Sequence, residues 1–444
     1  MIANYFLESM KHPISLPNYV ALLFLCSLLF VVILVMHSLW MNPNNSKKIY
    51  LVDFACYKPE ASNMISKKGL LDGFRPHLDN NETLEFMERI IDKCGLGDST
   101  YVPNALIRDP PNPCMEEARS EAEMVIFGAI DRLLAKMKGY VAKDIGILVV
   151  NCSIFNVVPS LSAMIVNRYQ FGDGILSYNL SGMGCSSGLI AIGLARNLLQ
   201  VHPNSHALVV STENITQNYY LGKDRSKVLA NCIFRVGGAA ILLSNRPSDR
   251  RSSKYQLIHT VHVTTAYSDS SYKCIFQEED GEGKLGVNIS RDLTSEASKS
   301  IQLNLITLGR LVLPVSKQLS FLINQLIRSF HVAKIKPHVP EFNKTFDHFL
   351  PHAGGRPLLD ELQRVLGFRD FDMEPARKTL YRYGNTSSST VWYQLAYCEA
   401  SERIKRGDSV WHIAFGSGFH CTSVVWRAIR TVDPEKDNPW IGEI

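Results

Sequence analysis

SYNLSGMGCSSGLIAIGLARNLLQ, residues 177–200, places Cys185 among small residues directly before an apolar run. The run over residues 189–195 is apolar on every side, which is typical of a buried helix. Serine and glycine suit the start of a helix, where the first backbone N–H groups have no partner within the helix. A thiol there faces the positive end of the helix dipole, which favours the nucleophilic thiolate. Cys185 is therefore a candidate for covalent catalysis; the alternative is an ordinary buried cysteine in a tight turn.

The segments on both sides of this stretch alternate between strand and helix patterns. Short apolar runs predict strands, and longer amphipathic runs predict helices. We expect strands at residues 48–56, 144–152, 207–211, 237–244, 254–263, 346–352 and 409–415, and helices at residues 82–93, 116–138, 161–168 and 357–367. A charged loop is expected at residues 277–284. Strands that alternate with helices indicate a layered α/β fold.

The two halves of the chain have the same order of elements. Cys152 ends an expected strand and precedes Cys185 by 33 residues, and His352 ends another and precedes Asn385 by the same 33 residues. Each helix element then leads to a further apolar strand, which predicts a duplicated α/β unit. The predicted halves are residues 47–245 and residues 246–444.

A twofold relation between these halves would bring Cys185, His352 and Asn385 to one cleft, where ligand sites commonly lie. His352 stands in HFLPHAGGRP, before a glycine turn that lets a ligand approach the backbone closely. Asn385 stands in RYGNTSSST, at an expected helix start. A structural histidine and a helix-capping asparagine are the alternatives. Backbone N–H groups for an oxyanion, or simply a turn, are offered by Gly416, Ser417 and Gly418.

Composition argues against a metal site and against nucleic acid as a partner. His348 and His352 form an H-x3-H pair, but Pro351 between them would disrupt the helix that such a metal site needs. The ten cysteines include no CxxC pair and no zinc spacing, which favours reduced thiols in the cytosol. The net charge of +5 is mild and spread along the chain, so nothing indicates a nucleic-acid partner.

A membrane anchor is predicted at the N-terminus. Residues 19–40, YVALLFLCSLLFVVILVMHSLW, contain no Asp, Glu, Lys or Arg and are long enough to cross a bilayer of about 30 Å. The run is longer than the core of a signal peptide, and the lysines that follow it place the rest of the chain in the cytosol. We expect residues 1–46 to form a single-span anchor rather than a buried core helix. A second long apolar segment, residues 300–331, is broken at Pro314; core is the default, with a lid or a lipid-facing surface as alternatives.

From residue 48 to the end, the sequence resembles the plant 3-ketoacyl-CoA synthases, the condensing enzymes of very-long-chain fatty acid elongation. The motifs that carry the resemblance occur in the family's order: YLVDFACYKP, NLSGMGCSSGLIAIGLA, VHPNSHALVVSTENIT, NCIFRVGGAAILLSN, LGRLVLPVS, HAGGRP, RYGNTSSS and GSGF. The resemblance implies a thiolase-type fold, in which two similar halves form five αβαβα layers. Chalcone synthase and the bacterial type III ketoacyl synthases share that architecture.

By resemblance, Cys185 takes the acyl chain of acyl-CoA as a thioester, while His352 and Asn385 hold malonyl-CoA as CO2 leaves. The backbone N–H of Cys185 and one from residues 416–418 would hold the oxyanion formed in the condensation. The family further implies acyl-CoA and malonyl-CoA as substrates without another cofactor, attachment to the endoplasmic reticulum membrane, a homodimer, and contacts with other elongase subunits.

Two departures from the family pattern stand out. Family members carry two N-terminal spans, where this sequence has one. His259 and His348 match family histidines, but Thr264 stands where the family has a further histidine. Thr264 motivates an alternative function, a weak or inactive regulatory member of the elongase complex. A soluble polyketide synthase relative is a third reading, against which the apolar N-terminal run argues.

Overall fold

The computed structural model describes residues 47–77, 81–137, 140, 142–329 and 341–444, together with Ser27 and Phe30. The chain separates into two compact units, Met1–Lys47 and Lys48–Ile444. The predicted span at residues 19–40 lies outside the described residues except for Ser27 and Phe30, which are both helical. Of the helices formed by described residues, none is long and apolar enough to cross a membrane.

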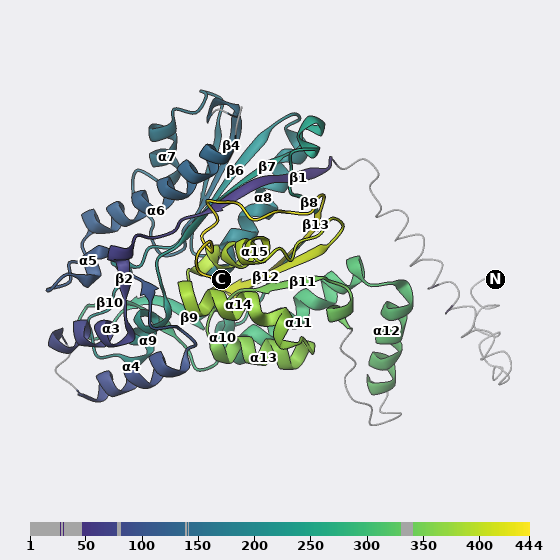
Figure 1. Ribbon diagram of the computed structural model, residues 1–444. Coiled ribbons are helices and arrows are strands. Elements are labelled where there is room, and N and C mark those ends of the chain that lie inside the picture. The colour runs from purple at the N-terminus through teal and green to yellow at the C-terminus, as the bar shows by residue number, and fades with distance from the viewer. Residues whose placement is uncertain are drawn as a thin grey trace, which may run out of the picture. The chain divides into compact units, whose positions relative to one another are not determined.

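In the described part of the chain, one mixed sheet of nine strands forms the centre of the second unit (Figure 1). Its strands, in spatial order, are β5 (Leu176–Leu180), β4 (Ile145–Asn151), β6 (His206–Thr212), β7 (Gly238–Ser244), β1 (Ile49–Cys56), β8 (Tyr255–Thr264), β13 (His420–Ala428), β12 (Ser409–Gly416) and β11 (His348–Pro351). β1 and β8 join over only three residue pairs, so this junction divides the sheet into two runs.

The two runs repeat the same strand pattern. β4 is parallel to β6, and β6–β7 and β7–β1 are antiparallel. β11 is likewise parallel to β12, and β12–β13 and β13–β8 are antiparallel. The repeat in order and direction is what a duplicated unit produces. The boundary between residues 245 and 246 stays a prediction.

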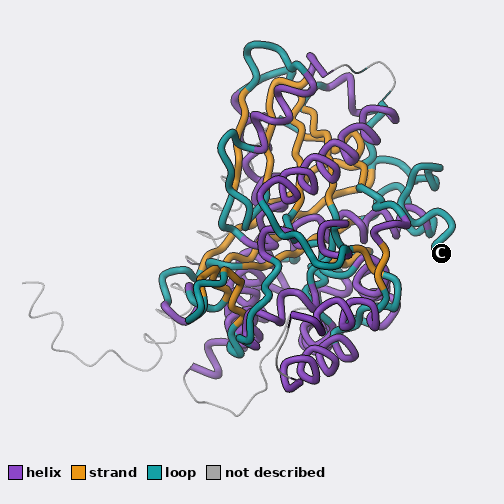
Figure 2. The backbone as a smooth tube through the Cα atoms, turned by 90° about the vertical axis from the view of Figure 1, so that its left-hand side faces the viewer, coloured by secondary structure: helices purple, strands orange, loops and turns teal. Residues whose placement is uncertain are grey.

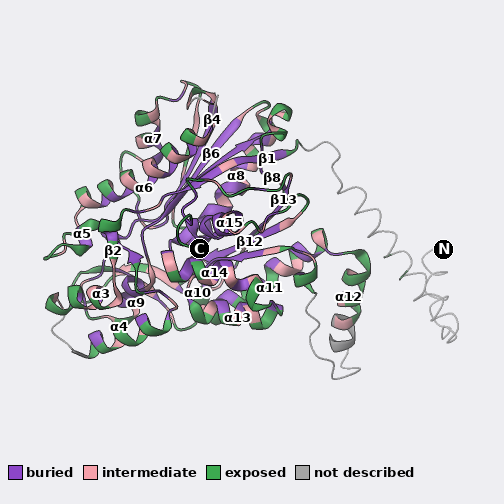
Figure 3. Cartoon of the chain, viewed as in Figure 1, coloured by how far each residue is buried: buried purple, intermediate pink, exposed green. Residues whose placement is uncertain are grey.

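Helices separate and cover the two runs of the sheet (Figure 2). α8 (Ser187–Val201) contacts β4 and β6 of the first run and β12 and β13 of the second, and α15 (Thr390–Ala400) contacts β1, β11 and β12. Both helices contribute to one central apolar cluster, in which their side chains are buried (Figure 3). α6 (Met115–Lys136) and α7 (Leu161–Tyr169) cover the other face of the first run. α11 (Leu293–Val312), α13 (Arg356–Leu366) and α14 (Asp370–Tyr383) cover the second, which gives five alternating layers.

The smaller elements lie around these layers. β2 (Met64–Ile65) pairs with β3 (Thr100–Tyr101), and β9 (Ile275–Glu279) pairs with β10 (Leu285–Ile289). The remaining helices are α3 (Lys67–Phe74), α4 (Asn81–Lys93), α5 (Asn104–Ile107), α9 (Arg225–Ile233), α10 (Asp269–Tyr272) and α12 (Val315–Ser329).

Most expected elements are confirmed within a few residues, including the break at Pro314 between α11 and α12. Several elements were not predicted, among them β5, α9, α14 and β13. α14 contains Pro375, which resembles a helix breaker, and β13 follows β12 after a turn too short to separate them by pattern. Of the loop expected at residues 277–284, residues 277–279 belong to β9, and the rest form the turn that joins β9 to β10.

A buried ion cluster ties distant parts of the fold together. Lys254 is fully buried, and its Nζ lies 2.8 Å from Asp53 of β1, 3.0 Å from Glu399 of α15 and 2.6 Å from Glu435 near the C-terminus. Burial opposes the charge of Lys254, but the three carboxylates outweigh burial and raise its pKa. Because these partners come from three segments, the cluster fixes the C-terminal segment against the central layer.

Lys254→Met should lower the free energy of unfolding by about 3–5 kcal/mol, because it leaves buried carboxylates without their cation. Lys344→Met is the control, since Lys344 pairs with Glu341 at 2.7 Å on the surface and is 71 % exposed. Urea unfolding followed by circular dichroism measures both. Equal stability of the two variants would contradict a structural role for the cluster.

Candidate active site

Cys185 lies in the tight turn Gly184–Ser186, which leads directly into α8 as the sequence predicts. Gly182 and Gly184 have φ angles of 71° and 58°, which glycine adopts without strain, so the chain turns sharply after β5. The Cys185 side chain is 9 % exposed. The thiol therefore lies at the N-terminal end of a buried helix, where unpaired N–H groups carry a partial positive charge.

The start of α15 lies beside the start of α8. α15 follows a similar tight turn, Ser387–Ser389. Asn151, the last residue of β4, donates from Nδ2 to Ser187 Oγ at 3.0 Å and to Ser388 Oγ at 2.6 Å. A Cβ at Gly188 would overlap the carbonyl oxygen of Ser388, so α8 approaches the turn before α15 closely at this glycine. Two helix N-termini, one from each run of the sheet, thus meet next to Cys185.

Hydrogen bonds of Asn385 link the turn before α15 to the segment that contains His352. His352 follows β11, is 2 % exposed, and its ring packs edge-on against Phe415 with 5.7 Å between centroids. Asn385 Nδ2 donates to the carbonyl of Gly354, two residues after His352, at 3.5 Å. Asn385 Oδ1 accepts from the backbone N–H of Ser387 at 2.9 Å, and Ser387 Oγ lies 3.5 Å from Cys185 Sγ. These contacts connect Cys185 to Asn385, and Asn385 to the backbone two residues beyond His352.

The predicted oxyanion loop closes the site. Gly416 ends β12, and a Cβ there would overlap the backbone nitrogen of Cys185. Ser417 Oγ donates to the carbonyl of Gly182 at 3.4 Å, and Gly418 has a φ angle of 118°. The backbones of residues 182–185 and 416–417 are consequently in direct contact, as a shared oxyanion site requires.

Cys185 and His352, the two titratable residues among the three predicted ones, are uncharged at neutral pH. Burial raises the pKa of the Cys185 thiol to about 12, with the charge of Glu213 adding to the shift and the hydrogen bond from Ser387 opposing it. Burial lowers the pKa of His352 to about 3. The expectation that the helix end ionises the resting thiol is therefore wrong, because desolvation of the sulfur outweighs the helix dipole. The resting pair is a thiol and a neutral imidazole.

Glu213 is a site residue that the sequence did not single out. Its carboxylate accepts hydrogen bonds from Ser153 N and Ile154 N, each at 3.0 Å, and from Ser387 Oγ at 3.0 Å. Burial raises the pKa of Glu213, although these donors oppose the shift. Ser387 has one hydroxyl proton, so it can donate to Glu213 or to Cys185, but not to both. The available signal was its position directly after β6, within STENIT.

The other predicted histidines lie elsewhere. His348 begins β11, and its Nε2 lies 2.8 Å from Asp408. His352 is four residues further along the chain, about 13 Å at the rise of a strand. Burial lowers the pKa of His259, and the charge of Arg196 adds to the shift. Arg196 is eleven residues beyond Cys185, about 16 Å along α8. Thr264 is exposed at the end of β8, where its Oγ1 accepts from Ala266 N at 3.3 Å. None of these three has a recorded contact with Cys185, His352 or Asn385 within the described residues.

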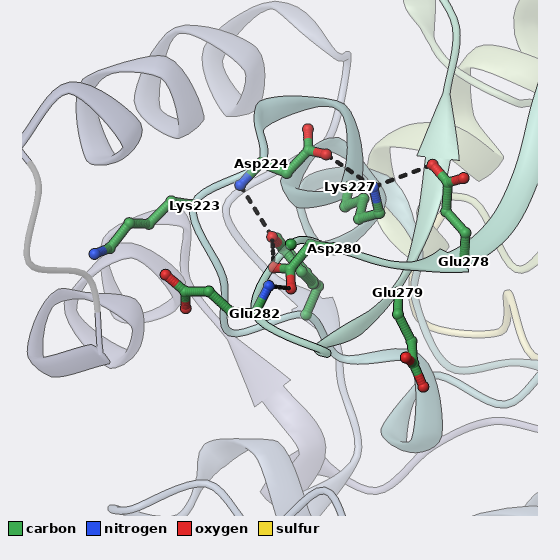
Figure 4. Close-up of a pocket in the computed structure, with 9 residues that line it drawn as sticks. Lys223, Asp224, Lys227, Glu278, Glu279, Asp280 and Glu282 are labelled. Atoms are coloured by element: carbon green, nitrogen blue, oxygen red, sulfur yellow. Dashed lines mark hydrogen bonds and ion pairs between the residues drawn. The ribbon is translucent and has the colours of Figure 1, made fainter.

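A cavity of about 460 Å³ lies outside this site (Figure 4). Charged residues of α9 and of the β9–β10 hairpin line it, and Lys227 bridges Asp224 at 2.8 Å and Glu278 at 3.2 Å. Cys185, His352 and Asn385 do not line this cavity. A search of the described residues for three or more His, Cys, Asp or Glu side chains able to hold a metal finds no such group.

Two of the solved structures that match this fold are polyketide synthases. The C-terminal type III polyketide synthase domain of Steely1 from Dictyostelium matches with a TM-score of 0.66 and 17 % identity, over 86 % of this chain and 99 % of that domain. PKS-I from the brown alga Ectocarpus siliculosus also matches with a TM-score of 0.66, at 16 % identity, over 87 % of this chain and all of that one. At such identities the likeness establishes the fold, a thiolase-like α/β fold of the chalcone synthase type.

Matches to two family models and to two relatives identify the class of protein. The model described as FAE1/Type III polyketide synthase-like protein matches residues 41–330, and the C-terminal model of 3-oxoacyl-(acyl-carrier-protein) synthase III matches residues 343–428. Arabidopsis thaliana 3-ketoacyl-CoA synthase 2 is 55 % identical over 95 % of this chain and 81 % of that protein. Arabidopsis thaliana 3-ketoacyl-CoA synthase 11 is 53 % identical over 94 % of this chain and 82 % of that protein. The chain belongs to the 3-ketoacyl-CoA synthases, a family of condensing acyltransferases.

Ser387→Ala should slow alkylation of Cys185 by iodoacetamide about tenfold at pH 8, because it removes a hydrogen bond of about 1.5 kcal/mol to the thiolate. The loss raises the pKa of Cys185 further, so less thiolate is present at a given pH. Ser389→Ala is the matched control, since Ser389 Oγ bonds to Thr386 and not to the sulfur. Mass spectrometry of the peptide with Cys185 gives the rates.

Glu213→Gln should shift the pKa of Cys185 in the opposite direction from Ser387→Ala. It removes the negative charge that raises the pKa of Cys185, so the pH profile of alkylation should move to lower pH. Identical profiles for the parent and both variants would show that neither residue acts on the sulfur.

Proposed function

We propose that this chain condenses a long or very-long-chain acyl-CoA with malonyl-CoA to give a 3-ketoacyl-CoA, CO2 and CoA. The observation that carries the proposal is the contact chain from Cys185 through Ser387 and Asn385 to Gly354, beside His352. It occurs in a member of the 3-ketoacyl-CoA synthase family, and its side chains are nearly all buried. Acyl-CoA and malonyl-CoA are the only small molecules that the proposed reaction needs.

In the first step, Cys185 Sγ attacks the carbonyl carbon of the acyl-CoA thioester. The thiol proton leaves through the neutral His352 imidazole and reaches the departing CoA sulfur, so the products are acyl-Cys185 and free CoA. Two helix N-termini at the site favour the negative charge that forms on the attacked oxygen. Because burial lowers the pKa of His352 to about 3, the imidazole is neutral at pH 7 and has one nitrogen without a proton. It is a weak base, so it passes the thiol proton on to the leaving sulfur and does not keep it.

In the second step, malonyl-CoA loses CO2 and its thioester oxygen becomes an enolate. Asn385 Nδ2 and the His352 imidazole are the proposed donors to that oxygen. An asparagine amide has two N–H donors, and only one, at 3.5 Å from Gly354 O, is engaged within the described residues. The buried Nδ1 of His352 also lacks a hydrogen-bond partner there, which a ligand or water would supply.

In the third step, the enolate carbon attacks the acyl-Cys185 carbonyl and forms a carbon–carbon bond. The oxyanion lies against the backbone N–H of Cys185 and one from residues 416–418, and its collapse releases the sulfur and 3-ketoacyl-CoA. Ser387 donates a hydrogen bond to the returning thiolate, a role supported by the 3.5 Å distance between its hydroxyl oxygen and the sulfur. A proton from solvent then restores the thiol.

Several features of the setting belong to the same proposal. The apolar run at residues 19–40 anchors the chain in the endoplasmic reticulum membrane, with the body in the cytosol. The protein acts as a homodimer with other elongase subunits nearby, and its halves divide at residues 245 and 246. Sequence composition and family membership support these statements.

Cys185→Ala should abolish formation of 3-ketoacyl-CoA, because no other group at the site can form the thioester. Cys114→Ala is the control, since Cys114 lies at the start of α6. The assay uses labelled malonyl-CoA with long acyl-CoAs and a host that lacks its own condensing enzymes. In a second host that keeps a weakly active condensing enzyme of its own, restored elongation by Cys185→Ala would instead assign a regulatory role.

Asn385→Asp should lower CO2 release from malonyl-CoA by about 10²–10³-fold, the usual loss for one donor to a developing oxyanion. The aspartate keeps the acceptor for Ser387 N and removes the N–H donors, so acylation of Cys185 should remain. Labelled CO2 and intact-protein mass spectrometry measure the two steps separately. Asn343→Asp, at an exposed amide that bonds to Gly367, is the control; equal loss of acylation and CO2 release would contradict this division of roles.

A further inference from the structure

α12 presents an apolar stripe to the solvent. Val315, Leu319 and Ile323 are 66 %, 43 % and 48 % exposed. They are spaced four residues apart, so they lie along one face of the helix. Leu311 at the end of α11 is 45 % exposed and extends the stripe toward the body. Figure 1 shows α12 extending from the layered body, and Figure 3 shows how much of it is exposed.

Exposed apolar residues elsewhere in the described chain are mostly isolated, as is usual for a protein surface. Val158, Tyr267 and Phe371, for example, belong to three different segments. The stripe on α12 differs because its members are contiguous on one helix. Such a contiguous face indicates a surface that another molecule covers.

The charge of this segment identifies the class of molecule. Residues 297–340 contain no Asp or Glu, and their basic residues are Lys299, Arg310, Lys317, Arg328, Lys334 and Lys336. The whole chain has 47 basic and 42 acidic residues, so the rest of the chain has 41 and 42. The net positive charge is therefore concentrated in this segment, rather than spread along the chain as the composition alone suggested.

An apolar helix face within a basic segment is typical of a helix that lies in the surface of an anionic bilayer. We propose that α12 and the end of α11 dock on an anionic lipid surface, with Val315, Leu319 and Ile323 at the boundary between headgroups and acyl chains. The docking is a contact of the described body itself, distinct from the predicted anchor at residues 19–40, and it does not depend on the condensing activity.

Two other molecules that could cover the stripe fit the positive charge of this segment less well. A second copy docked through the same face would place the same basic segments opposite each other, because a twofold contact pairs identical surfaces. The apolar run at residues 19–40 contains no acidic residue to complement the basic side chains. Lys317 pairs with Glu341 at the surface, where ion pairs contribute little and can rearrange. Lys299 pairs with the buried Glu296 just before the segment, so it contributes least to the charge that is available to a partner.

Tryptophan quenching in the full chain tests the proposal. Two variants of the full chain are made, one with Leu319→Trp and one with Ile323→Trp. Each is reconstituted into phosphatidylcholine vesicles, with or without phosphatidylserine. The vesicle lipids carry bromine at a shallow position. A helix in the interface lies about 5–10 Å deep, within reach of such bromines. Met115→Trp is the matched control, since Met115 is 47 % exposed and lies on α6, in the opposite outer layer.

The emission of the parent protein is subtracted; its described tryptophans, Trp392, Trp411, Trp426 and Trp440, are all buried. We expect brominated lipid to quench the new emission of Leu319→Trp and Ile323→Trp, more strongly with phosphatidylserine, and to leave Met115→Trp unchanged. Adding Arg310→Glu to Leu319→Trp should reduce the increase in quenching that phosphatidylserine causes.

Two results would overturn the proposal. Blue-shifted emission that brominated lipid does not quench would mean that protein, either a second copy or the chain's own N-terminal run, covers the stripe. Emission typical of water without quenching would mean that nothing covers it. Condensing activity is measured on the same samples, so quenching in an inactive chain would reject the proposed function and leave the docking intact.

Discussion

The relation between the two helix starts at the site depends on one buried amide, that of Asn151 at the end of β4. Asn151 holds the serine hydroxyls at the starts of α8 and α15, and its Oδ1 accepts from Ser211 Oγ at 2.7 Å. Each helix belongs to a different run of the sheet, so this contact fixes the relation of the two runs at the site. Because a buried amide that loses its partners costs free energy, the arrangement is held at the point where chemistry requires it. The positions of Cys185 and Ser387 follow from this contact.

The sequence predicted Cys185, His352 and Asn385 as partners because each carries a local signal. A cysteine among glycines before an apolar run, a histidine before a glycine turn and an asparagine before a helix can all be recognised without coordinates. The strands of the two runs could be predicted for the same reason, since a buried strand is a short apolar run. The matching spacing in both halves then suggested that these residues converge.

Glu213 and the protonation states could not be predicted in this way. The donors to Glu213 come from Ser153, Ile154 and Ser387, which are far apart in sequence, so only the fold reveals that a carboxylate is buried there. The pKa of Cys185 depends on how deeply the sulfur is packed, and no local pattern encodes packing depth. His348 shares a strand face with His352 and therefore resembles a partner of it. His348 lies at the start of β11, however, whereas His352 follows its end.

Burial that suppresses charge in the resting site is also what makes its hydrogen-bond donors effective. A thiol with a pKa near 12 and an imidazole with a pKa near 3 both remain neutral at pH 7. Neither side chain therefore carries a charge of its own at rest, and in the proposed reaction negative charge forms on substrate oxygens beside backbone N–H groups and two helix N-termini. In a site with little water those dipoles act in a low effective dielectric, where they stabilise charge more strongly than in solution. Since the donors are fixed by the backbone of the central layer, they need no reorganisation when the charge forms.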